Sequence, residues 1–414
     1  MSFSKYLLVS LCFAVSAASA TDWSGHLKYQ PLVANFPEDS YFRNFTDSPT
    51  VDNNLDGRFN FSFSKNTLSF EAHYQLLAKT GDSVELYKQM QGLELIAPFF
   101  PDDSRRLFNL SDYIVDQDSA LLVHRLDRLN LTYSGNANVL KVGRQAISWG
   151  NGLLFNPMDF FNPFDPTAVD KEYKTGDDMV YAQHLFANGS DAQFVWVGRR
   201  DFDGERGADF NSAAGKYHLF VGQHEVDLLL SKHYEDTLFS LGGVWTLGGA
   251  IARTDIVYTE TEFDNYVSAV ANLSYSWLWF DKNISASLEY FRNGFGIDDG
   301  DYSPSTLLAN LDLLKRLERG ESFNLAKDYL AATATIELHP LWLVTPNVFY
   351  NLNDSSYLFQ FVSSHDLASN LQLVLSVNLP GGNEGSEFGG IQVDVAEHYL
   401  SAGASFFGQL SWYF

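Results

Sequence analysis

The sequence predicts an all-β fold, a transmembrane antiparallel β-barrel of about 18 strands (16 to 18) with short turns at one end and long loops at the other. Three observations predict it. Segments of about ten residues alternate apolar and polar side chains along almost the whole chain. Aromatic residues make up 15% of the chain, although its mean hydropathy is only −0.14. Beyond the first 20 residues, no apolar run reaches the roughly 18 residues expected of a spanning helix.

The C-terminus carries the clearest alternation. Leu410, Trp412 and Phe414 fall on one face of an extended segment, and Gln409 and Ser411 fall on the other. A final aromatic residue on such a strand resembles the signal that the outer-membrane barrel assembly machinery reads. We therefore predict that machinery as a partner and Phe414 as the assembly signal. The alternative is a core strand of a soluble sandwich, for which this segment is long.

The same alternation places eighteen strands along the chain, most of them of about ten residues, the length that crosses a bilayer when tilted. The predicted strands span 25–33, 55–64, 66–78, 121–133, 138–147, 178–187, 190–200, 216–222, 224–233, 237–246, 248–259, 266–280, 283–293, 326–338, 341–352, 356–363, 369–379 and 400–414.

Connection lengths give an independent indication. Barrels of the outer membrane have short periplasmic turns and long extracellular loops. Short, turn-rich connections, such as Asn188-Gly189 and Ser364-His365-Asp366, alternate with long ones. Segment 391–395 also resembles a strand, but a span there would break this alternation, so we assign it to the last extracellular loop. The long segments are 34–54, 79–120, 148–177, 201–215, 294–325 and 380–399.

Two loops show helical spacing. In segment 294–325, leucines recur at helical intervals after Ser303 or Ser305, either of which is a suitable N-cap, and Gly320 ends the run. Asp82 to Gln91 is a second candidate for a short helix. There is no sign of a linker or tandem repeat, so residues 21–414 form one barrel domain in this interpretation.

The first 20 residues predict a secretory signal peptide. Lys5 precedes an apolar stretch from Tyr6 to Val15, and Ala18-Ser19-Ala20 provides a small-residue cleavage site before Thr21. The apolar stretch is too short for a membrane anchor helix. Export followed by insertion predicts the outer membrane of a Gram-negative bacterium as the location, with outer-membrane lipid as a partner.

Composition excludes several functional classes. The one cysteine, Cys12, lies in the predicted signal, so the mature chain has no disulfide, thiolate-bound zinc or thiol nucleophile. Removing the signal, which holds one Lys and no acid, changes the net charge from −24 to −25. Such a charge argues against a nucleic-acid partner.

Residues 52–63 start like a calcium loop, but the twelfth position is Phe63, where a glutamate is required, so the match fails. We predict no cofactor and no metal. Bridging of the acidic loops by divalent ions stays open.

One motif stands out, Gly143-Arg144-Gln145 followed by Ser148-Trp149-Gly150 and a proline-rich aromatic loop. Here the sequence resembles outer-membrane porins of the broad alginate-export-like kind. In these, a Gly-Arg-Gln strand opens into a Trp-Gly turn and a loop folded into the lumen. The resemblance covers this strand and loop, and elsewhere only the strand rhythm and the aromatic end. It implies a channel without naming the cargo.

The loop itself has the stiffness and apolar content of a buried segment, with three prolines in eleven residues. Two interpretations stay open. The loop either tucks into the barrel and narrows the pore, or it packs over the barrel rim. The predicted constriction residues are Trp149, Asn156, Asp159, Phe160, Phe161, Phe164 and Asp165.

Charged residues recur within the predicted strands. A lipid-facing arginine near the bilayer midplane costs about 2–4 kcal/mol, so we expect these arginines to face the lumen or lie near a rim. There they would select anionic solutes, or simply pair with acids and brace the barrel. Arg144 shares the parity of Leu140 and Val142, so a bulge would be needed to turn it inward. The predicted pore-lining residues are Arg128, Arg144, Arg199, Arg253, Arg292, Asp227, Glu289 and Glu337.

No catalytic signature accompanies these features. The sequence has no nucleophile elbow, zinc-protease helix, phosphate loop or dinucleotide fingerprint. We therefore predict a channel for small hydrophilic or anionic solutes and not an enzyme. The alternatives are an exporter of an acidic polysaccharide, a barrel-embedded hydrolase using a pair such as His184 and a serine, and a barrel plugged by its own loops.

Overall fold

The computed structural model describes residues 19–90, 99–201, 203–393 and 398–414. Of the predicted signal peptide, residues 1–18 lie outside the described residues, and Ser19 and Ala20 begin the first strand. Cleavage before Thr21 therefore stays a prediction.

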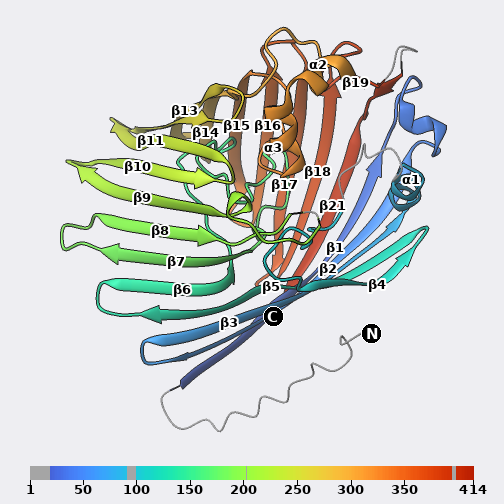
Figure 1. Cartoon of the computed structure of the whole chain (residues 1–414). Coiled ribbons are helices and arrows are strands. Elements are labelled where there is room, and N and C mark those ends of the chain that lie inside the picture. The colour runs from blue at the N-terminus through green and yellow to red at the C-terminus, as the bar shows by residue number, and fades with distance from the viewer. Residues whose placement is uncertain (1–18, 91–98, 202, 394–397) are drawn as a thin grey trace.

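Within the described ranges, eighteen antiparallel strands form the barrel wall (Figure 1). They are β1 (Ser19–Ala34), β2 (Thr50–Lys65), β3 (Leu68–Gly81), β5 (Ala120–Ser134), β6 (Asn138–Gln145), β7 (Asp177–Leu185), β8 (Asp191–Val197), β9 (Ser212–Val221), β10 (His224–His233), β11 (Asp236–Leu247), β12 (Ala250–Glu260), β13 (Asn265–Trp279), β14 (Lys282–Arg292), β15 (Asp328–His339), β16 (Trp342–Asn351), β17 (Tyr357–Ala368), β18 (Leu371–Gly381) and β21 (Ser405–Tyr413).

The wall closes where the first and last strands meet. β1 pairs with β2 on one side and with β21 on the other, in the register His26 opposite Tyr413. β21 in turn pairs with β18, where Leu371 lies opposite Trp412. Closure gives each spanning strand a partner on both sides, which a lipid environment requires because no water is present to satisfy a free strand edge.

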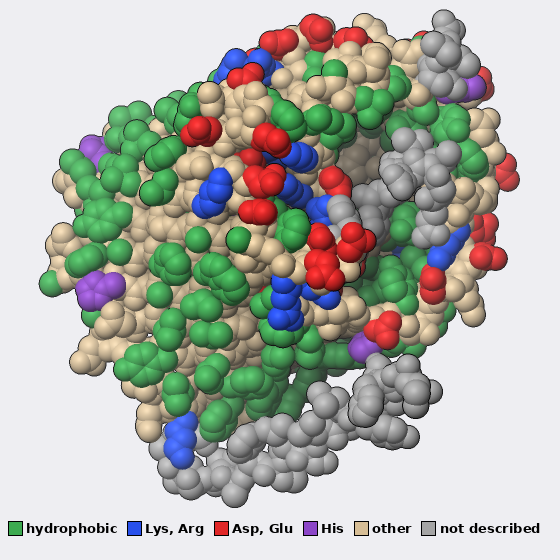
Figure 2. Space-filling view, viewed as in Figure 1, with side chains coloured by type: hydrophobic (Ala, Val, Ile, Leu, Met, Phe, Trp, Pro, Cys, Tyr) green, Lys and Arg blue, Asp and Glu red, His purple; other side chains and the backbone are tan. Residues whose placement is uncertain are grey.

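Side chains follow the predicted alternation. Leu228, Leu273 and Leu288 point outward and are exposed, whereas Asp227, Asn272 and Glu289 on the same strands are buried in the interior. Figure 2 shows hydrophobic side chains spread over the outward strand faces on the left of the view, and charged side chains gathered at its centre and top. An apolar outer face around a polar interior is the pattern of a lipid-embedded barrel.

No helix among the described residues is long and apolar enough to span a membrane.

The predicted strands are confirmed in number and order, and most differences concern ends. β17 continues to Ala368 past a register shift beside Asp366, so the turn is 369–370 and not 364–366 as predicted. The last predicted strand began at residue 400, but the spanning strand begins at Ser405. Two short strands, β19 (Ile391–Gln392) and β20 (Tyr399–Leu400), pair with each other outside the barrel. The assignment of 391–395 to a loop is therefore confirmed for its described residues.

Both loops with predicted helical spacing contain helix, and segment 294–325 holds two helices where one was predicted. The described residues include α1 (Asp82–Met90), α2 (Pro304–Ala309) and α3 (Leu311–Glu318), with short 3₁₀ turns at Tyr41–Asn44 and Ala208–Phe210. The side chain of Asn310 caps α3 by accepting from the Leu313 N–H, whereas Ser303 precedes α2 without a side-chain cap. All three helices lie at the barrel end away from the short turns (Figure 1).

One stretch of the wall departs from a simple barrel. β6 pairs only with residues 129–134 of β5, and a further strand, β4 (Ser111–Gln117), pairs with residues 120–125 above it. The wall thus continues above the end of β6 through a segment from an extracellular loop. We call this region, residues 103–117 with the upper ends of β5, β6 and β7, the seam.

Replacing an outward residue in the middle of the wall by arginine tests whether this face of the strands contacts lipid. We expect Leu273→Arg to lower the free energy of unfolding from lipid vesicles by about 2–4 kcal/mol, because the charge would lie near the bilayer midplane. Ser276→Arg, on the lumenal face of the same strand, is the matched control and should change it much less. Equal losses for both variants would contradict the assignment. The measurement is urea unfolding in vesicles.

Candidate functional site: the lumenal loop and the charged cleft

Residues 146–176 leave the wall after β6 and cross the inside of the barrel before β7; we call them the lumenal loop. Two glycines make the departure possible. Gly143 has φ +124°, and a Cβ there would meet the Leu129 carbonyl oxygen at 2.2 Å. Gly150 has φ +97°, and its Cβ would lie 2.0 Å from Asn156 Oδ1. The motif that suggested the porin resemblance is therefore the structural element that turns the chain inward.

Two carboxylates on the far wall hold the tip of this loop. Glu289 of β14 accepts the backbone N–H groups of Leu153 at 2.9 Å, Leu154 at 3.1 Å and Phe155 at 2.6 Å. Asp255 of β12 accepts the backbone N–H of Asn151 at 2.6 Å and its side-chain amide at 2.7 Å. A carboxylate that receives several N–H donors forms charge-assisted hydrogen bonds, so these two side chains fix the loop across the lumen.

Apolar contacts support the same docking. Phe155 stacks on Phe291 with ring centroids 4.6 Å apart and planes 8° from parallel. A second cluster packs the loop against inward aliphatic residues of β7–β12, and its loop members are Trp149, Met158, Phe160 and Phe161. Of the two interpretations left open, the described structure has the loop inside the barrel and not over the rim.

The loop returns along the opposite wall. Gln360 of β17 donates to the Thr167 carbonyl at 2.8 Å. Lys28 of β1 binds Asp170 at 2.6 Å and Glu172 at 2.7 Å. The loop therefore contacts β12, β14, β17 and β1, so it reaches most of the way around the interior.

The remaining predicted loop residues act within the loop. Asn156 donates to the Trp149 carbonyl at 2.9 Å, and Asp165 accepts from Thr167 at 2.7 Å. Phe164 is half-buried. Asp159 and Lys174 form a buried ion pair, and burial raises the pKa of Asp159 to about 6 against the opposing effect of the Lys174 charge. These residues shape the loop instead of facing an open pore.

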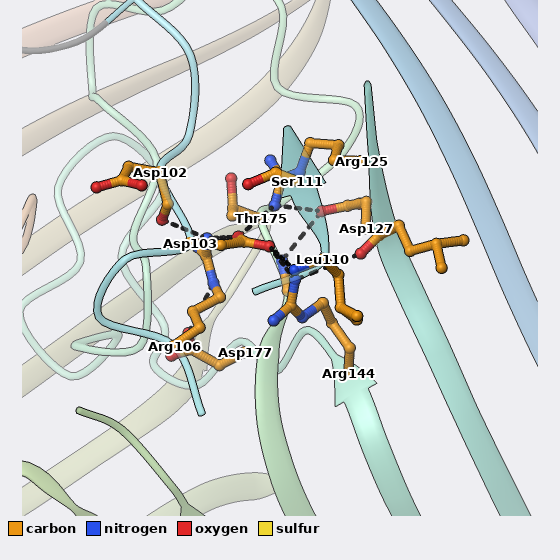
Figure 3. A network of polar contacts seen from close by, with 12 residues as sticks. Asp102, Asp103, Arg106, Leu110, Ser111, Arg125, Asp127, Arg144, Thr175 and Asp177 are labelled. Carbon is orange, nitrogen blue, oxygen red and sulfur yellow. Dashed lines mark hydrogen bonds and ion pairs between the residues drawn. The ribbon is translucent and has the colours of Figure 1, made fainter. Parts of the chain in front are cut away.

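The seam contains a network of buried arginines and aspartates (Figure 3). Asp103, fully buried, forms ion pairs with Arg106 and Arg144 and accepts the Leu110 N–H at 3.1 Å. Arg144 also binds Asp178 of β7 through two nitrogens, at 3.0 and 2.9 Å. These bonds join the end of β6, the inserted segment and β7 where ladder hydrogen bonds are missing.

The network continues along β7. Asp177 accepts from Arg106 at 3.2 Å and from Arg199 at 2.9 Å. Burial by itself would raise the pKa of Asp103, but the charges of Arg106, Arg144 and Arg125 outweigh it and hold the pKa below the usual 3.8. Asp103 is therefore ionised at neutral pH.

The five predicted arginines lie in different environments in the structure. Arg128 turns inward at a bulge in β5 and binds Asp127 and the Lys174 carbonyl. Arg199 is buried in the seam network. Arg253 faces the lumen, donates to Ser274 Oγ at 2.6 Å, and has no ion-pair partner among the described residues.

Two arginine predictions need correction. Arg144 does not line the pore; no bulge turns it inward, because it ends β6 and its guanidinium lies in the seam. Arg292 shares the outward parity of Tyr290 and pairs with Asp328 at the rim, at 2.9 Å. Strand parity therefore places the Arg292 side chain on the outer face, away from the lumen.

The three predicted acids all face inward, and two of them have partners that define their role. Glu289 holds the lumenal loop, as described above. Asp227 binds His218 at 2.9 Å and Lys216 at 3.3 Å. Glu337 accepts from Asn283, at 2.8 Å, and contacts neither the lumenal loop nor a cation in the described ranges.

A cleft between the lumenal loop and the wall of β1, β2, β3 and β5 carries a set of cations that the sequence analysis did not select. We call it the charged cleft. Phe99 and Phe100 cover one end of it, and Tyr173 of the lumenal loop lies over Arg58, 4.1 Å from the guanidinium to the ring centre. Its basic residues are Lys28, Arg58, Lys79 and Arg125.

The hydrogen-bonding capacity left over in this cleft is mostly donor. Asp127 is satisfied by Arg58 at 2.9 Å and by Arg128 at 2.7 Å. The other cleft cations have carboxylate partners as well: Lys79 lies 3.7 Å from Asp52, and Arg125 NH2 lies 3.4 Å from Asp127 and 3.7 Å from Asp103. Arg58 Nε and Arg125 Nε are buried with no hydrogen-bond partner in the described structure. Strand parity could have placed Lys28 and Arg58 inside, since each alternates with outward apolar residues. Parity alone could not have placed Arg125 in the cleft, because its position there depends on the seam beside it.

The described structure also contains a serine–histidine–acid arrangement. His233 lies 2.9 Å from Ser212 Oγ through Nδ1 and 2.9 Å from Glu321 through Nε2. Ser212 and His233 are buried, and Phe160 and Phe161 pack against the imidazole. A substrate has no approach to this serine, so the arrangement does not favour the hydrolase alternative. His184, at the rim, bonds Asn138 at 2.8 Å.

Comparison with known proteins supports the architecture. No protein-family model and no curated protein matches the sequence. Among solved structures, Acinetobacter baumannii OccAB1 matches with TM-score 0.53 at 8% identity, over 95% of this chain and 96% of that one. Pseudomonas aeruginosa OccK8 (OprE) matches with TM-score 0.54 at 7% identity, over 95% and 98%. A doubly substituted variant of OccD1 (OprD) gives 0.50 at 10%, over 95% of each chain.

These neighbours are outer-membrane porins of Gram-negative bacteria. At such low identity the likeness concerns the fold, and the chain shares their closed barrel. The alginate-export-like kind is not identified by these matches and stays a prediction.

Removing the main loop anchor should release the lumenal loop. We expect Glu289→Ala to increase single-channel conductance and to speed hydrogen exchange at the Leu153 to Phe155 amides, because three charge-assisted bonds of about 1.5–3 kcal/mol each are lost. Glu337→Ala is the matched control, since it removes an inward acid on the next strand without touching the loop. Unchanged exchange in Glu289→Ala would contradict the anchoring role.

The stability of the seam should depend on the negative charge of Asp103. We expect Asp103→Asn to lower the free energy of unfolding by about 3–5 kcal/mol, because Arg106 and Arg144 each lose one of their two buried carboxylate partners. The exposed neighbour Asp102→Asn should have little effect. Since the pKa of Asp103 lies below its usual value, its stabilising contribution should persist above pH 3.8 and fall as the pH drops further. Urea unfolding in vesicles as a function of pH measures both.

Proposed function

We propose that this protein is an outer-membrane channel that passes small hydrophilic solutes, with a preference for those carrying a negative charge. The observation that carries the proposal is the charged cleft, where Lys28, Arg58, Lys79 and Arg125 line the lumen beside the lumenal loop. The positive charges of these side chains attract a carboxylate or a similar anion into the cleft, while the buried Arg58 and Arg125 nitrogens do not contact it directly.

The size limit follows from the loop. A segment anchored on both sides of the barrel narrows the lumen, and Tyr173 narrows it further over Arg58. Such a passage suits small solutes better than a polymer, so export of an acidic polysaccharide is the weaker transport alternative. The barrel architecture shared with OccAB1 and OccK8 supports the outer membrane as the location.

The proposed charge selectivity therefore lies mainly with residues other than the arginines predicted from the sequence. Arg144 lies in the seam, Arg292 lies outside the lumen, and Arg199 is buried in its ion pair with Asp177. Arg128 shares Asp127 with Arg58 of the cleft. Those pairs brace the wall, as the simpler interpretation of the sequence expected. Selectivity in this proposal depends on the cleft residues, with Arg253 as a further lumenal charge. Recognition of Phe414 by the assembly machinery is also part of the proposal.

Substitution in the cleft tests the charge preference. We expect Arg58→Gln with Arg125→Gln to reduce the anion-to-cation permeability ratio by roughly fivefold, equivalent to about 1 kcal/mol, because two lumenal cations are lost. Reversal potentials in a KCl gradient across a planar bilayer measure this ratio.

Arg292→Gln is the control, since it removes an outward cation and should leave the ratio unchanged. An unaltered ratio in the cleft variant would contradict the charge preference. A protein that inserts but shows no conductance steps would instead favour the plugged-barrel alternative.

A further inference from the structure

The described part of the last extracellular loop that directly follows β18, residues 382–393, docks on the ends of β15 and β16. Glycines are frequent in it, at positions 382, 385, 389 and 390. Gly385 and Gly390 have positive φ, +83° and +111°. A glycine-rich segment loses much conformational entropy when it is ordered, so specific contacts must hold it in place.

Glu387 provides those contacts. Its carboxylate accepts the Leu325 N–H at 2.8 Å, the Tyr329 hydroxyl at 2.5 Å and the Asn351 side-chain amide at 2.8 Å. Leu325 belongs to the loop before β15, Tyr329 to β15 and Asn351 to β16. One side chain thus joins two extracellular loops to the barrel rim.

The groups around this carboxyl are neutral or acidic. Asp354, in the turn after β16, accepts the Glu387 N–H at 2.8 Å, and Tyr302 accepts from Asn351 at 3.0 Å. In the part of the chain that the structure describes, Glu387 takes part in no ion pair. Burial raises the pKa of Glu387 to about 7, the Asp354 charge adds to the effect, and the three hydrogen bonds oppose it.

The loop also forms one side of a cavity in the lumen. Glu387, Phe388 and Gly390 face Thr167 of the lumenal loop across this cavity, with Gln360 and Asn378 of the wall between them. Movement of the loop away from the rim would therefore widen the passage next to the lumenal loop.

We propose that the loop carrying Glu387 is an acid-sensitive cover, which docks on the rim when this carboxyl is protonated and lifts when it is ionised. The inference rests on the proposed channel function. Docked, the carboxyl binds its proton more tightly than an exposed glutamate with a pKa near 4.5. Docking therefore takes up a proton at pH values between these two pKa values, so the docking equilibrium weakens by up to tenfold per pH unit from about pH 4.5 to about pH 7 and stays constant above that. A neutral carboxyl still accepts hydrogen bonds from Leu325 and Asn351 without burying a charge.

Single-channel recording of the full chain tests the cover. The bath on the extracellular side is varied from about pH 4 to about pH 8.5, which spans the pKa of an exposed glutamate and that of docked Glu387. We expect the wild type to show fewer or smaller openings near pH 4 and more near pH 7, with little further change above about pH 7. Glu387→Gln, which stays neutral, should remain in the acid-like state across the range.

Glu384→Gln is the matched control, because Glu384 is an exposed acid of the same loop and its loss should leave the pH response intact. A second measurement uses the absence of cysteine after the predicted signal. In Ser386→Cys, maleimide labelling relative to an exposed Glu384→Cys should rise with pH, and the added Glu387→Gln change should abolish that rise.

The possible outcomes separate the two proposals. Conductance that does not respond to pH, or a response that survives in Glu387→Gln, overturns the cover and leaves the channel standing. A complete absence of conductance at every pH overturns the channel itself, and labelling then still reports whether the loop moves.

Discussion

The arrangement of the lumen depends on hydrogen bonds between wall carboxylates and loop backbone amides. Glu289 and Asp255 project inward from strands on the far side of the barrel and receive the N–H groups of residues 151–155. A loop inside a barrel has backbone donors that would otherwise need water, and a buried carboxylate needs donors. Each group thus satisfies the other, and the loop is held where it can narrow the passage.

The seam follows the same principle in the wall. β6 ends early so that the chain can enter the lumen, and the edges of β5 and β7 then need other partners. β4 supplies part of the missing ladder, and the Asp103–Arg144–Asp178 contacts supply the rest. Buried ion pairs of this kind contribute modest net stability but are costly to break, so they define one arrangement of the inserted segment.

These two features leave an asymmetric interior. The charged cleft runs along β1, β2, β3 and β5, while amides and hydroxyls such as Gln360 and Asn378 line the side near the last extracellular loop. The lumenal loop lies between them, tied to β1 through Lys28 and to β17 through Gln360. A selective surface and a movable cover can therefore act on the same passage from different sides.

The sequence by itself determined the barrel, because a two-residue period decides which side chains face lipid and needs only local information. It also determined the side of the long loops and the inward nature of residues such as Glu289. Parity argued against a lumenal Arg144 and a lumenal Arg292, and the pore-lining prediction followed it for neither residue. Tertiary structure decided which charges are free and which are bound. Glu289 meets Leu153 across 136 residues of chain, and Arg125 belongs to the cleft only because the seam closes beside it. Such partners come from the closure of the sheet and the path of the loop, and no local pattern encodes them.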